Sequence, residues 1–172
     1  MFNQLFCRLR LVCWCLVCVA TRADGIFADF TTSVGSFSCS LDYTNAPKTV
    51  ANFIGLATGE RSWLDFTTGL ARTQPFYDGL TIDGIFADYG IQAGAANRAG
   101  NVGPGYSFLN DHTSTAIRHP AGTLFQLNPS TGTSASEFVI AGRLGASTYQ
   151  KHTVFGYLIS GADPIAQGGG AP

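Results

Sequence analysis

The sequence carries little charge. Lys and Arg number 10 and Asp and Glu 11 in 172 residues, so charged residues make up 12% of the chain and the formal net charge is -1. Only two of the cations are lysines, Lys48 and Lys151. Nucleic-acid binding needs clustered Lys and Arg to meet the phosphates, and the sequence excludes a partner of that kind. The hydrophobic share of 45% argues against disorder and is enough for a core.

Histidine and cysteine are too scattered for a metal centre. The three histidines are His112, His119 and His152, no two of them stand at metal-ligand spacing, and no Cys–His cluster exists. We therefore expect no metal and no other cofactor. The hydroxyl-rich segment 133–136 has no histidine beside it in sequence, so it leaves a serine nucleophile open but does not support one.

A long hydrophobic run is also missing. The apolar segment 11–20 is too short for a membrane span, which needs roughly 20 residues. Two arginines precede it and small residues follow it, which is the order of a secretory signal peptide. We predict that residues 1–23 are such a signal, cleaved after Ala23, and that the protein works outside the cytoplasm, in the periplasm or secreted. A lipoprotein signal ending at Cys18 and a buried core segment are the alternatives.

One cysteine, Cys39, would remain after that cleavage. A single cysteine excludes an internal disulfide, so stability must come from packing. Cys39 alternates with serines, and we interpret it as a small inward-facing residue, with a reactive thiol as the alternative. Three of the 10 cations lie in residues 1–23 and none of the 11 acids does, so the remaining chain carries 7 against 11, or -4.

Periodicity predicts many short strands and one helix. Segments that are apolar or alternate in polarity, bounded by turn residues, predict strands at 26–32, 37–41, 80–85, 89–93, 123–127, 138–141 and 153–160. The first two are separated by turn residues and predict a hairpin. Residues 60–73 read as a polar loop. Short strands with one helix favour a β-barrel with a helical lid.

The predicted helix covers residues 45–59. Its apolar positions form one stripe at helical spacing: Val50, Phe53, Ile54 and Ala57. Thr44 or Asn45 is expected to cap the start, Pro47 suits the first turn, and Gly59 suits a left-handed stop.

Several segments together carry a family signature. They are Pro75-Phe76-Tyr77-Asp78-Gly79-Leu80, Tyr89-Gly90-Ile91-Gln92-Ala93-Gly94, the predicted helix, the glycine loop 103–108, and the segments 119–124, 136–140 and 151–156. In this order, from about residue 26 to residue 167, the chain resembles the cyclophilins, the cyclosporin-binding class of peptidyl-prolyl cis-trans isomerases. The insert at 60–73 is similar to that of secreted bacterial members. The resemblance implies a mainly β fold: a closed antiparallel barrel with capping helices over residues 24–167, followed by a Gly-rich tail or linker at 168–172.

The resemblance also implies where an X–Pro bond would be held. The family's Phe-His-Arg motif reads Ile82-Asp83-Gly84 here, so the catalytic arginine position is Gly84. The positions that correspond to substrate-binding residues are Tyr89, Gly90, Gln92, Leu127, Asn128, Glu137, Val139, Thr148 and His152. Gln92, Asn128 and His152 keep the family's residue, and either contact substrate or hold loops by hydrogen bonds. Ser147 stands where the family has a tryptophan, so we expect low cyclosporin sensitivity.

The loss at Gly84 bears directly on the reaction. Rotation about the amide has a barrier of ~18–20 kcal/mol, and losing one preorganised transition-state donor costs ~2.7–4 kcal/mol. Arg98 and Arg118 are the nearby cations in sequence, and we interpret both as surface charges. Three hypotheses follow: a weak extracytoplasmic isomerase, a non-catalytic peptide-binding or chaperone-like module, and a decayed domain. The expected partners are proline-containing peptides or unfolded proteins, bound by a monomer.

The C-terminal part departs from the family. Members end with a further strand that pairs beside the first, whereas this match stops near Gln167. By this comparison the final strand is missing, which predicts an open edge at 26–32, a site for strand addition. A truncated gene product, a linker to further chain and pairing with a partner strand are the competing explanations.

Overall fold

The computed structural model describes residues 16–22, 25–33, 35–86, 89–97, 102–111, 118–127, 133–142, 146–147 and 152–161. These contain one helix, α1 (Pro47–Thr58). The strands are β1 (Leu16–Arg22), β2 (Gly25–Thr32), β3 (Gly35–Leu41), β4 (Trp63–Asp65), β5 (Leu70–Arg72), β6 (Ile82–Phe86), β7 (Gly90–Ala93), β8 (Phe108–Leu109), β9 (Arg118–His119), β10 (Thr123–Gln126), β11 (Thr133–Ser134), β12 (Phe138–Ala141), β13 (Ala146–Ser147) and β14 (Thr153–Gly161). The predicted mainly β class is confirmed.

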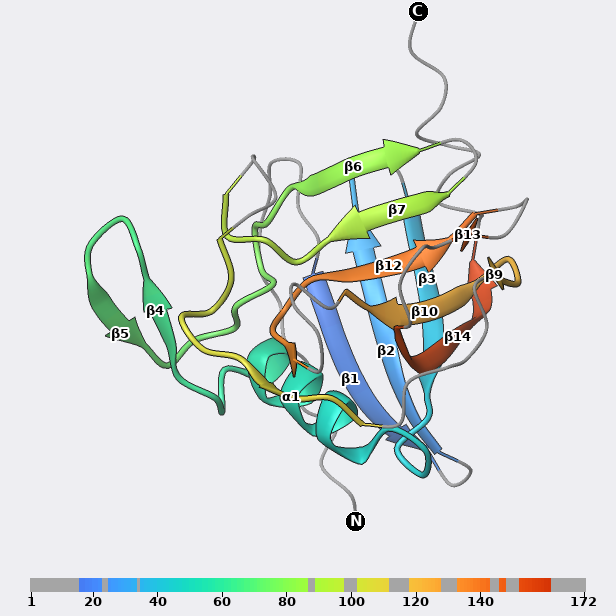
Figure 1. Ribbon diagram of the computed structural model, residues 1–172, viewed down its shortest axis with the longest axis horizontal. Helices are drawn as coiled ribbons and strands as arrows, with labels where there is room; N and C mark the ends of the chain where they lie inside the picture. The colour runs from blue at the N-terminus through green and yellow to red at the C-terminus, as the bar shows by residue number, and fades with distance from the viewer. Residues whose placement is uncertain are drawn as a thin grey trace, which may run out of the picture.

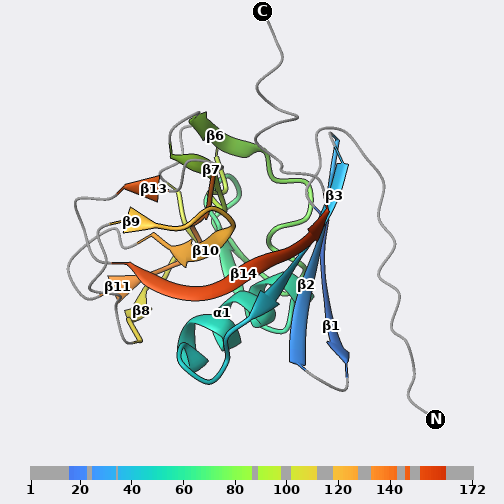
Figure 2. The ribbon, with the colours of Figure 1, turned by 90° about the vertical axis from the view of Figure 1, so that its right-hand side faces the viewer.

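Eight of these strands form one curled antiparallel sheet. Its order is β1-β2-β3-β14-β10-β12-β7-β6, which leaves β1 and β6 as the edges of a half-barrel. In Figure 1 the strands β1, β2 and β3 run steeply, whereas β6, β7 and β12 run across them. The long strand β14 curves between the two halves in Figure 2. Its pairing shifts register against both β10 and β3, and such irregularities bend a strand.

The inside of the curl holds the main core. Alternation in β2 and β3 turns Ala28, Phe30, Phe37 and Cys39 inward, and the rings of Phe30 and Phe37 stack with centroids 4.7 Å apart. Cys39 is fully buried, and its burial, followed by the charge of Asp29, raises the pKa of the thiol to about 12. The prediction that Cys39 faces inward is confirmed, and the thiol is unreactive at neutral pH.

Helix α1 closes one end of this core. Val50, Phe53 and Ala57 are buried, as their spacing predicts, and Gly59 ends the helix with a left-handed φ of 78°. The predicted side-chain cap from Thr44 or Asn45 is wrong. Ala46 is the N-cap and has no side-chain cap, and the Thr49 N–H and hydroxyl donate instead to the Asp111 carboxylate, at 2.7 and 2.9 Å.

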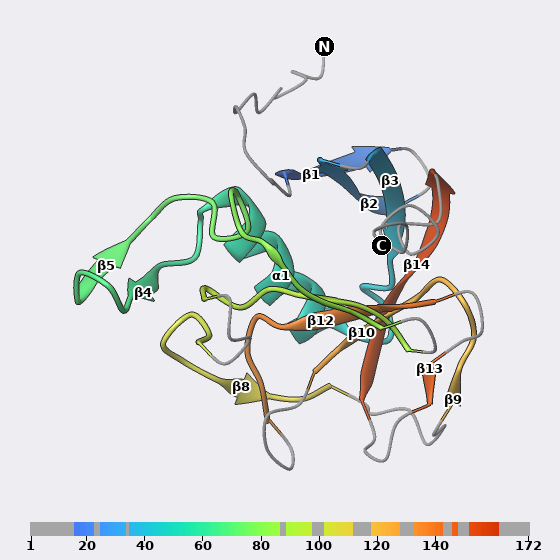
Figure 3. The same ribbon diagram turned by 90° about the horizontal axis from the view of Figure 1, so that it is seen from above.

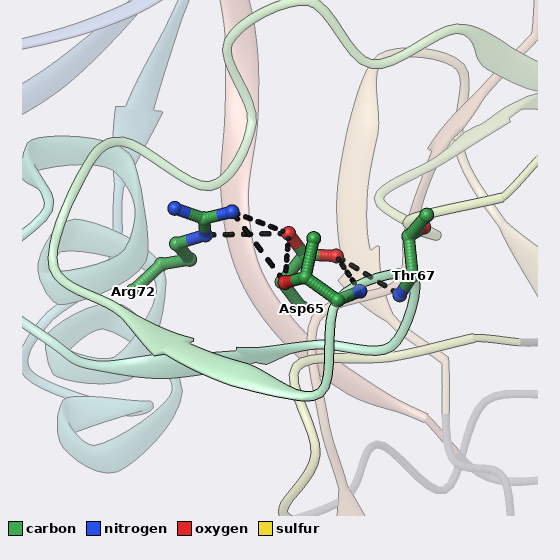
Figure 4. Close-up of polar contacts among 4 residues, drawn as sticks. Asp65, Thr67 and Arg72 are labelled. Atoms are coloured by element: carbon green, nitrogen blue, oxygen red, sulfur yellow. Dashed lines mark hydrogen bonds and ion pairs between the residues drawn. The ribbon is translucent and has the colours of Figure 1, made fainter.

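Residues 60–73 contain a hairpin rather than a plain loop. Strands β4 and β5 pair in register and project beside α1, as Figure 3 shows. At the turn the Asp65 carboxylate accepts the main-chain N–H of Thr67 at 2.9 Å and binds the Arg72 guanidinium at 3.0 Å (Figure 4). Polar composition alone predicted a loop, whereas the structure pairs the segment into two short strands on either side of this turn.

The edge of β2 is not open. Strand β1 pairs with it antiparallel from Leu16↔Thr31 to Arg22↔Gly25, so the predicted exposed edge is wrong for the structure as described. The strand comes from the segment that the sequence assigns to a signal peptide. The tail 168–172 lies outside the described residues.

Candidate active site

Four predicted or neighbouring site positions lie in one row across four strands. Gly84 of β6 is opposite Gln92 of β7, Gln92 is opposite Val139 of β12, and Val139 is opposite Phe125 of β10. Directly opposed residues in antiparallel strands project from the same face of the sheet. Gln92 and Val139, 47 positions apart in the sequence, are thus brought side by side on one surface.

This row lies on the face turned away from the main core. The alternate residues Leu124, Phe138 and Ile140 belong to the main core. Phe125, Val139 and Ala141 form a second apolar cluster, against which the half-buried Tyr89, Leu127 and Val154 pack. The predicted positions Tyr89, Leu127 and Val139 therefore meet in one apolar patch, of the kind that a proline ring would contact.

The residue at the centre of that patch is Phe125, which the sequence reading did not single out. Its ring is fully buried, lies parallel to the His119 ring at 4.5 Å, and meets the Tyr89 ring edge-on at 6.0 Å. Phe125 is opposite Val139, so it places an aromatic ring next to that predicted site position. The sequence did place a phenylalanine in the predicted strand 123–127, which could have indicated an aromatic site residue. Only the strand pairing shows that this residue adjoins Val139.

Gly84 is covered by a neighbouring ring. A side chain added at Gly84 would bring its Cβ within 2.5 Å of the Phe86 ring, which is half-exposed. The Phe86 ring also meets the Tyr89 ring edge-on, with centroids 6.2 Å apart. Two residues apart on one strand, Gly84 and Phe86 share a face, so an aromatic ring occupies the space beside the catalytic arginine position.

Gly90 leaves no space for the larger residue of the family. Its φ is 146°, and a Cβ there would lie 2.2 Å from the Ile140 carbonyl oxygen. Because backbone rather than a flexible side chain blocks the site, no side chain fits without moving β7 away from β12. At the predicted site position Gly90 the surroundings are therefore main chain, with no room for a side chain.

Gln92 is held by a carboxylate. Its Nε2 donates to Glu137 Oε2 at 3.3 Å, and the Glu137 main-chain oxygen accepts the Leu127 N–H at 2.9 Å. Burial, and then the nearby charge of Asp83, raise the pKa of Glu137, while the hydrogen bond from Gln92 opposes that rise. An amide nitrogen has two N–H groups, so the bond to Glu137 engages only one of those of Gln92.

Asp83 replaces the family's histidine and lies at a bulge. The β6–β7 register shifts between Ile82 and Gly84, which leaves Asp83 unpaired, and its carboxylate accepts the Ala95 N–H at 3.1 Å. Burial raises the pKa of Asp83 to about 6, and the Ala95 hydrogen bond opposes this rise. The site thus contains two neighbouring acids where the family motif would bring a cation.

The arginines whose side chains are described are engaged elsewhere. Arg61 lies over the Tyr106 ring at 5.3 Å, and Arg72 pairs with Asp65. Arg98 and the side chain of Arg118 lie outside the described residues, as do two predicted site residues, Asn128 and Thr148. Gly84 therefore has no guanidinium partner among the residues described.

His152 lies behind the patch rather than free in it. It is buried, its ring centroid is 5.2 Å from that of Phe125, and a hydrogen bond ties it to the Gln126 main chain. Burial, and then the nearby His119, lower the pKa of His152, so the ring is neutral at pH 7. Of its two predicted roles, the geometry supports the one of holding the structure.

A separate hollow of about 330 Å³ lies under the β4–β5 hairpin. It is lined by Trp63, Phe66, Pro75, Asp78 and Val102 among others, and by none of the row residues.

No group of three potential metal ligands occurs in the described part of the chain. Nor does any described helix have the length and apolarity to cross a membrane. The row on β6, β7, β12 and β10 remains the candidate site.

Comparisons with known proteins identify the family of the chain. The family model "Cyclophilin type peptidyl-prolyl cis-trans isomerase/CLD" matches residues 27–167. The chain is 35% identical to "Peptidyl-prolyl cis-trans isomerase B" of Streptomyces anulatus over 135 residues, 78% of this chain and 77% of that protein. It is 33% identical to "Peptidyl-prolyl cis-trans isomerase A" of Mycobacterium tuberculosis over 133 residues, 77% and 72% of the two chains.

A solved structure is also similar. The crystal structure of a Cryptosporidium parvum cyclophilin type peptidyl-prolyl cis-trans isomerase, in the presence of the dipeptide Ala-Pro, aligns with a TM-score of 0.59 at 20% identity, covering 81% of this chain and 82% of that one. At this identity the likeness concerns the fold.

Proposed function

The chain belongs to the cyclophilin family of peptidyl-prolyl cis-trans isomerases, and we propose that it binds X–Pro segments of peptides or unfolded proteins across the row on β6, β7, β12 and β10 and isomerises them slowly. The observation that carries this proposal is the register that brings Gly84, Gln92 and Val139 together on one face.

Binding would use the apolar patch. A proline ring set against Tyr89, with Val139 and the buried Phe125 beneath, gains burial worth about 25 cal/mol per Å². The exposed ring of Phe86 extends this surface past Gly84. The contacts are mostly aromatic, which favours a ring-shaped apolar guest over a charged one.

Turnover would be slow because of the donors. Isomerisation needs a hydrogen-bond donor that weakens amide resonance as the bond twists, and Gly84 brings no side chain. Gln92, oriented by Glu137, is the donor that the described row provides. Loss of one preorganised donor costs roughly 10²–10³ in rate, so we expect an activity lower than that of family members with the arginine by about that factor.

The test is exchange spectroscopy on an Ala-Pro peptide with the full chain. We expect catalysis above the uncatalysed rate and a loss of about tenfold in Gln92→Ala, with peptide affinity changed much less. Thr67→Ala, in the hairpin away from the row, is the matched control and should behave as the unaltered protein. If neither binding nor catalysis is observed at micromolar protein, the result favours a decayed domain and contradicts the proposal.

Phe86 supports a second candidate function. Because its ring occupies the space beside Gly84, the row is also suited to hold proline peptides without turning them over, as a peptide-binding or chaperone-like module. Calorimetric titration separates the two functions: heat of binding with no exchange catalysis selects the module. Action outside the cytoplasm stays a prediction from residues 1–23, and β1, drawn from those residues, bears directly on it.

A further inference from the structure

Strand β1 is built into the sheet. Seven of its residues pair with β2, from Leu16↔Thr31 to Arg22↔Gly25, and this register leaves only two residues between the strands. The views in Figures 1, 2 and 3 agree in placing β1 along the outer side of β2. The cleavage point predicted from the sequence, after Ala23, falls in that connection.

Side chains of β1 reach the main core. Val17 is 3% exposed and belongs to the core cluster with Ala28 and Phe30, and Val19 packs against the same cluster. In the register Val17 is opposite Phe30 and Val19 is opposite Ala28, so both valines are on the inward face. Helix α1 also packs against β1. Removing this strand would expose the core at Ala28 and Phe30.

A polar contact ties the strand to a distant part of the chain. The Val17 main-chain N–H donates to the carboxylate of Asp78, and the Oδ1 of that carboxylate is buried with no hydrogen-bond partner among the described residues. Asp78 precedes β6, the opposite edge of the sheet in strand order. Without the Val17 N–H, the charged form of the half-buried Asp78 carboxylate would be higher in free energy. This contact therefore favours the paired position of β1.

We infer that the edge of β2 is a strand-binding site whose occupant is residues 16–22 of this chain, and that the working protein retains β1 rather than losing it with a leader cleaved after Ala23. One sheet edge takes one strand. The place beside β2 where the resemblance puts the family's C-terminal strand is occupied here by β1. Any foreign extended segment would have to displace β1 first.

The first test is hydrogen exchange on the full chain. In Val17→Asp, a charge enters the core beneath β1, and protection of the β2 amides should fall at least tenfold. Thr31→Asp, at an exposed position of the same hairpin, is the control and should leave this protection unchanged. If Val17→Asp does not fold, Val17→Ala replaces it, with a smaller loss expected in the same segment. Unchanged β2 protection in both Val17 variants would overturn the inference.

The second test cuts the chain without removing anything. A protease site placed in the 23–24 connection of the full chain is cleaved after folding. We expect the N-terminal piece to stay bound through gel filtration and to be displaced by excess synthetic peptide of residues 16–22, but not by the same peptide carrying Val17→Asp. Immediate separation of the piece with no change in melting temperature would overturn the inference.

The third test concerns retention. Intact-mass measurement of the protein isolated from the cells that make it should show residues 16–22 present. A mature chain that starts at Asp24 would overturn retention and support the signal peptide instead. None of these outcomes depends on catalysis, so the peptide-binding proposal is tested separately by its own exchange assay.

Discussion

At the scale of single residues, Gly84 and Phe86 have to be considered together. The position that corresponds to the family's arginine by resemblance is a glycine, and the Phe86 ring two residues later fills the space that a side chain at Gly84 would need. Phe86 is exposed and its ring is the end of a flexible side chain, so it can be removed without disturbing backbone. Asp83 and Glu137 lie near enough to affect each other's charge, and both would favour a guanidinium placed there.

We therefore predict a gain of activity from the pair Gly84→Arg and Phe86→Ala. The double variant should isomerise an Ala-Pro peptide about tenfold to a hundredfold faster than Phe86→Ala alone, because a preorganised donor returns to the row. Exchange spectroscopy at fixed peptide concentration measures the ratio. Equal rates in the two variants, with peptide binding intact, would show that Gly84 is not the position that limits turnover.

Asp83 makes stability depend on pH in a defined direction. Its pKa of about 6 in the folded protein is above the ordinary value of 3.8. Between these values the folded state holds more protons than the unfolded state, so the contribution of Asp83 to stability is lost as the pH rises from about 4 to 6. The other acid of the site, Glu137, is shifted in the same direction.

Asp83→Asn should remove this dependence. The difference in free energy of unfolding between the variant and the unaltered protein should be about 1 kcal/mol more favourable to the variant at pH 7.5 than at pH 4. This is less than the full pKa difference implies, because solvent screens a half-exposed group. Asparagine keeps an oxygen that accepts the Ala95 N–H. Thermal unfolding at both pH values measures the change, with the exposed Glu60→Gln as control. A difference that is the same at both pH values would contradict the assignment.

At the scale of elements, one carboxylate binds the first turn of α1 and another binds the turn of the β4–β5 hairpin. Asp111, 62 residues away in sequence, accepts the N–H of Thr49 in the first turn of the helix. Asp65 accepts main-chain N–H groups of Thr67 and Thr68 and the Arg72 guanidinium within the hairpin. The helix cap is a tertiary contact, whereas the hairpin contact is local.

For the hairpin we predict different effects from its two charged partners. The pKa of Asp65 is lowered to about 2, chiefly by the Thr68 hydroxyl and then by Arg72. Asp65→Ala should therefore open the hairpin at all pH values, whereas Arg72→Ala should open it much less. In the unaltered protein the hairpin contribution is present above pH 3.8 and is lost as the pH falls towards 2.

Hydrogen exchange of the β5 amides, Leu70–Arg72, measures hairpin opening. Exchange across β10 and β12 is the internal control, because the hairpin does not pair with the main sheet. Equal opening in Asp65→Ala and Arg72→Ala would show that the ion pair, not the turn, holds the hairpin.

At the scale of the whole molecule, one sheet separates stability from binding. The face towards the curl holds the large core with Phe30, Phe53 and Phe138, and the opposite face of β10 and β12 holds the small cluster around Phe125. Successive side chains along each strand point to opposite faces of the sheet, so neighbouring residues belong to different clusters. We therefore expect substitutions at the half-buried Gln92 to disturb the proposed peptide contact, and substitutions at the fully buried Val139 and Phe125 to disturb packing.

The sequence by itself determined the class of fold, the inward position of Cys39 and the stop of the helix at Gly59. These depend on periodicity and backbone preference within a few residues, and the local signal is strong. It also indicated the positions of Gly84, Gln92 and Val139 through the family resemblance, though not their mutual distances.

Only the tertiary structure decided the rest. The Asp111 cap, the ring of Phe86 beside Gly84, the placement of Phe125 next to Val139 and the pairing of β1 with β2 all join segments that no local pattern relates. An apolar run of ten residues is equally suited to a leader and to an edge strand, because hydrophobicity alone does not say what buries it. The register of the sheet shows what buries such a run, since it determines which side chains share a face and which edge has a partner.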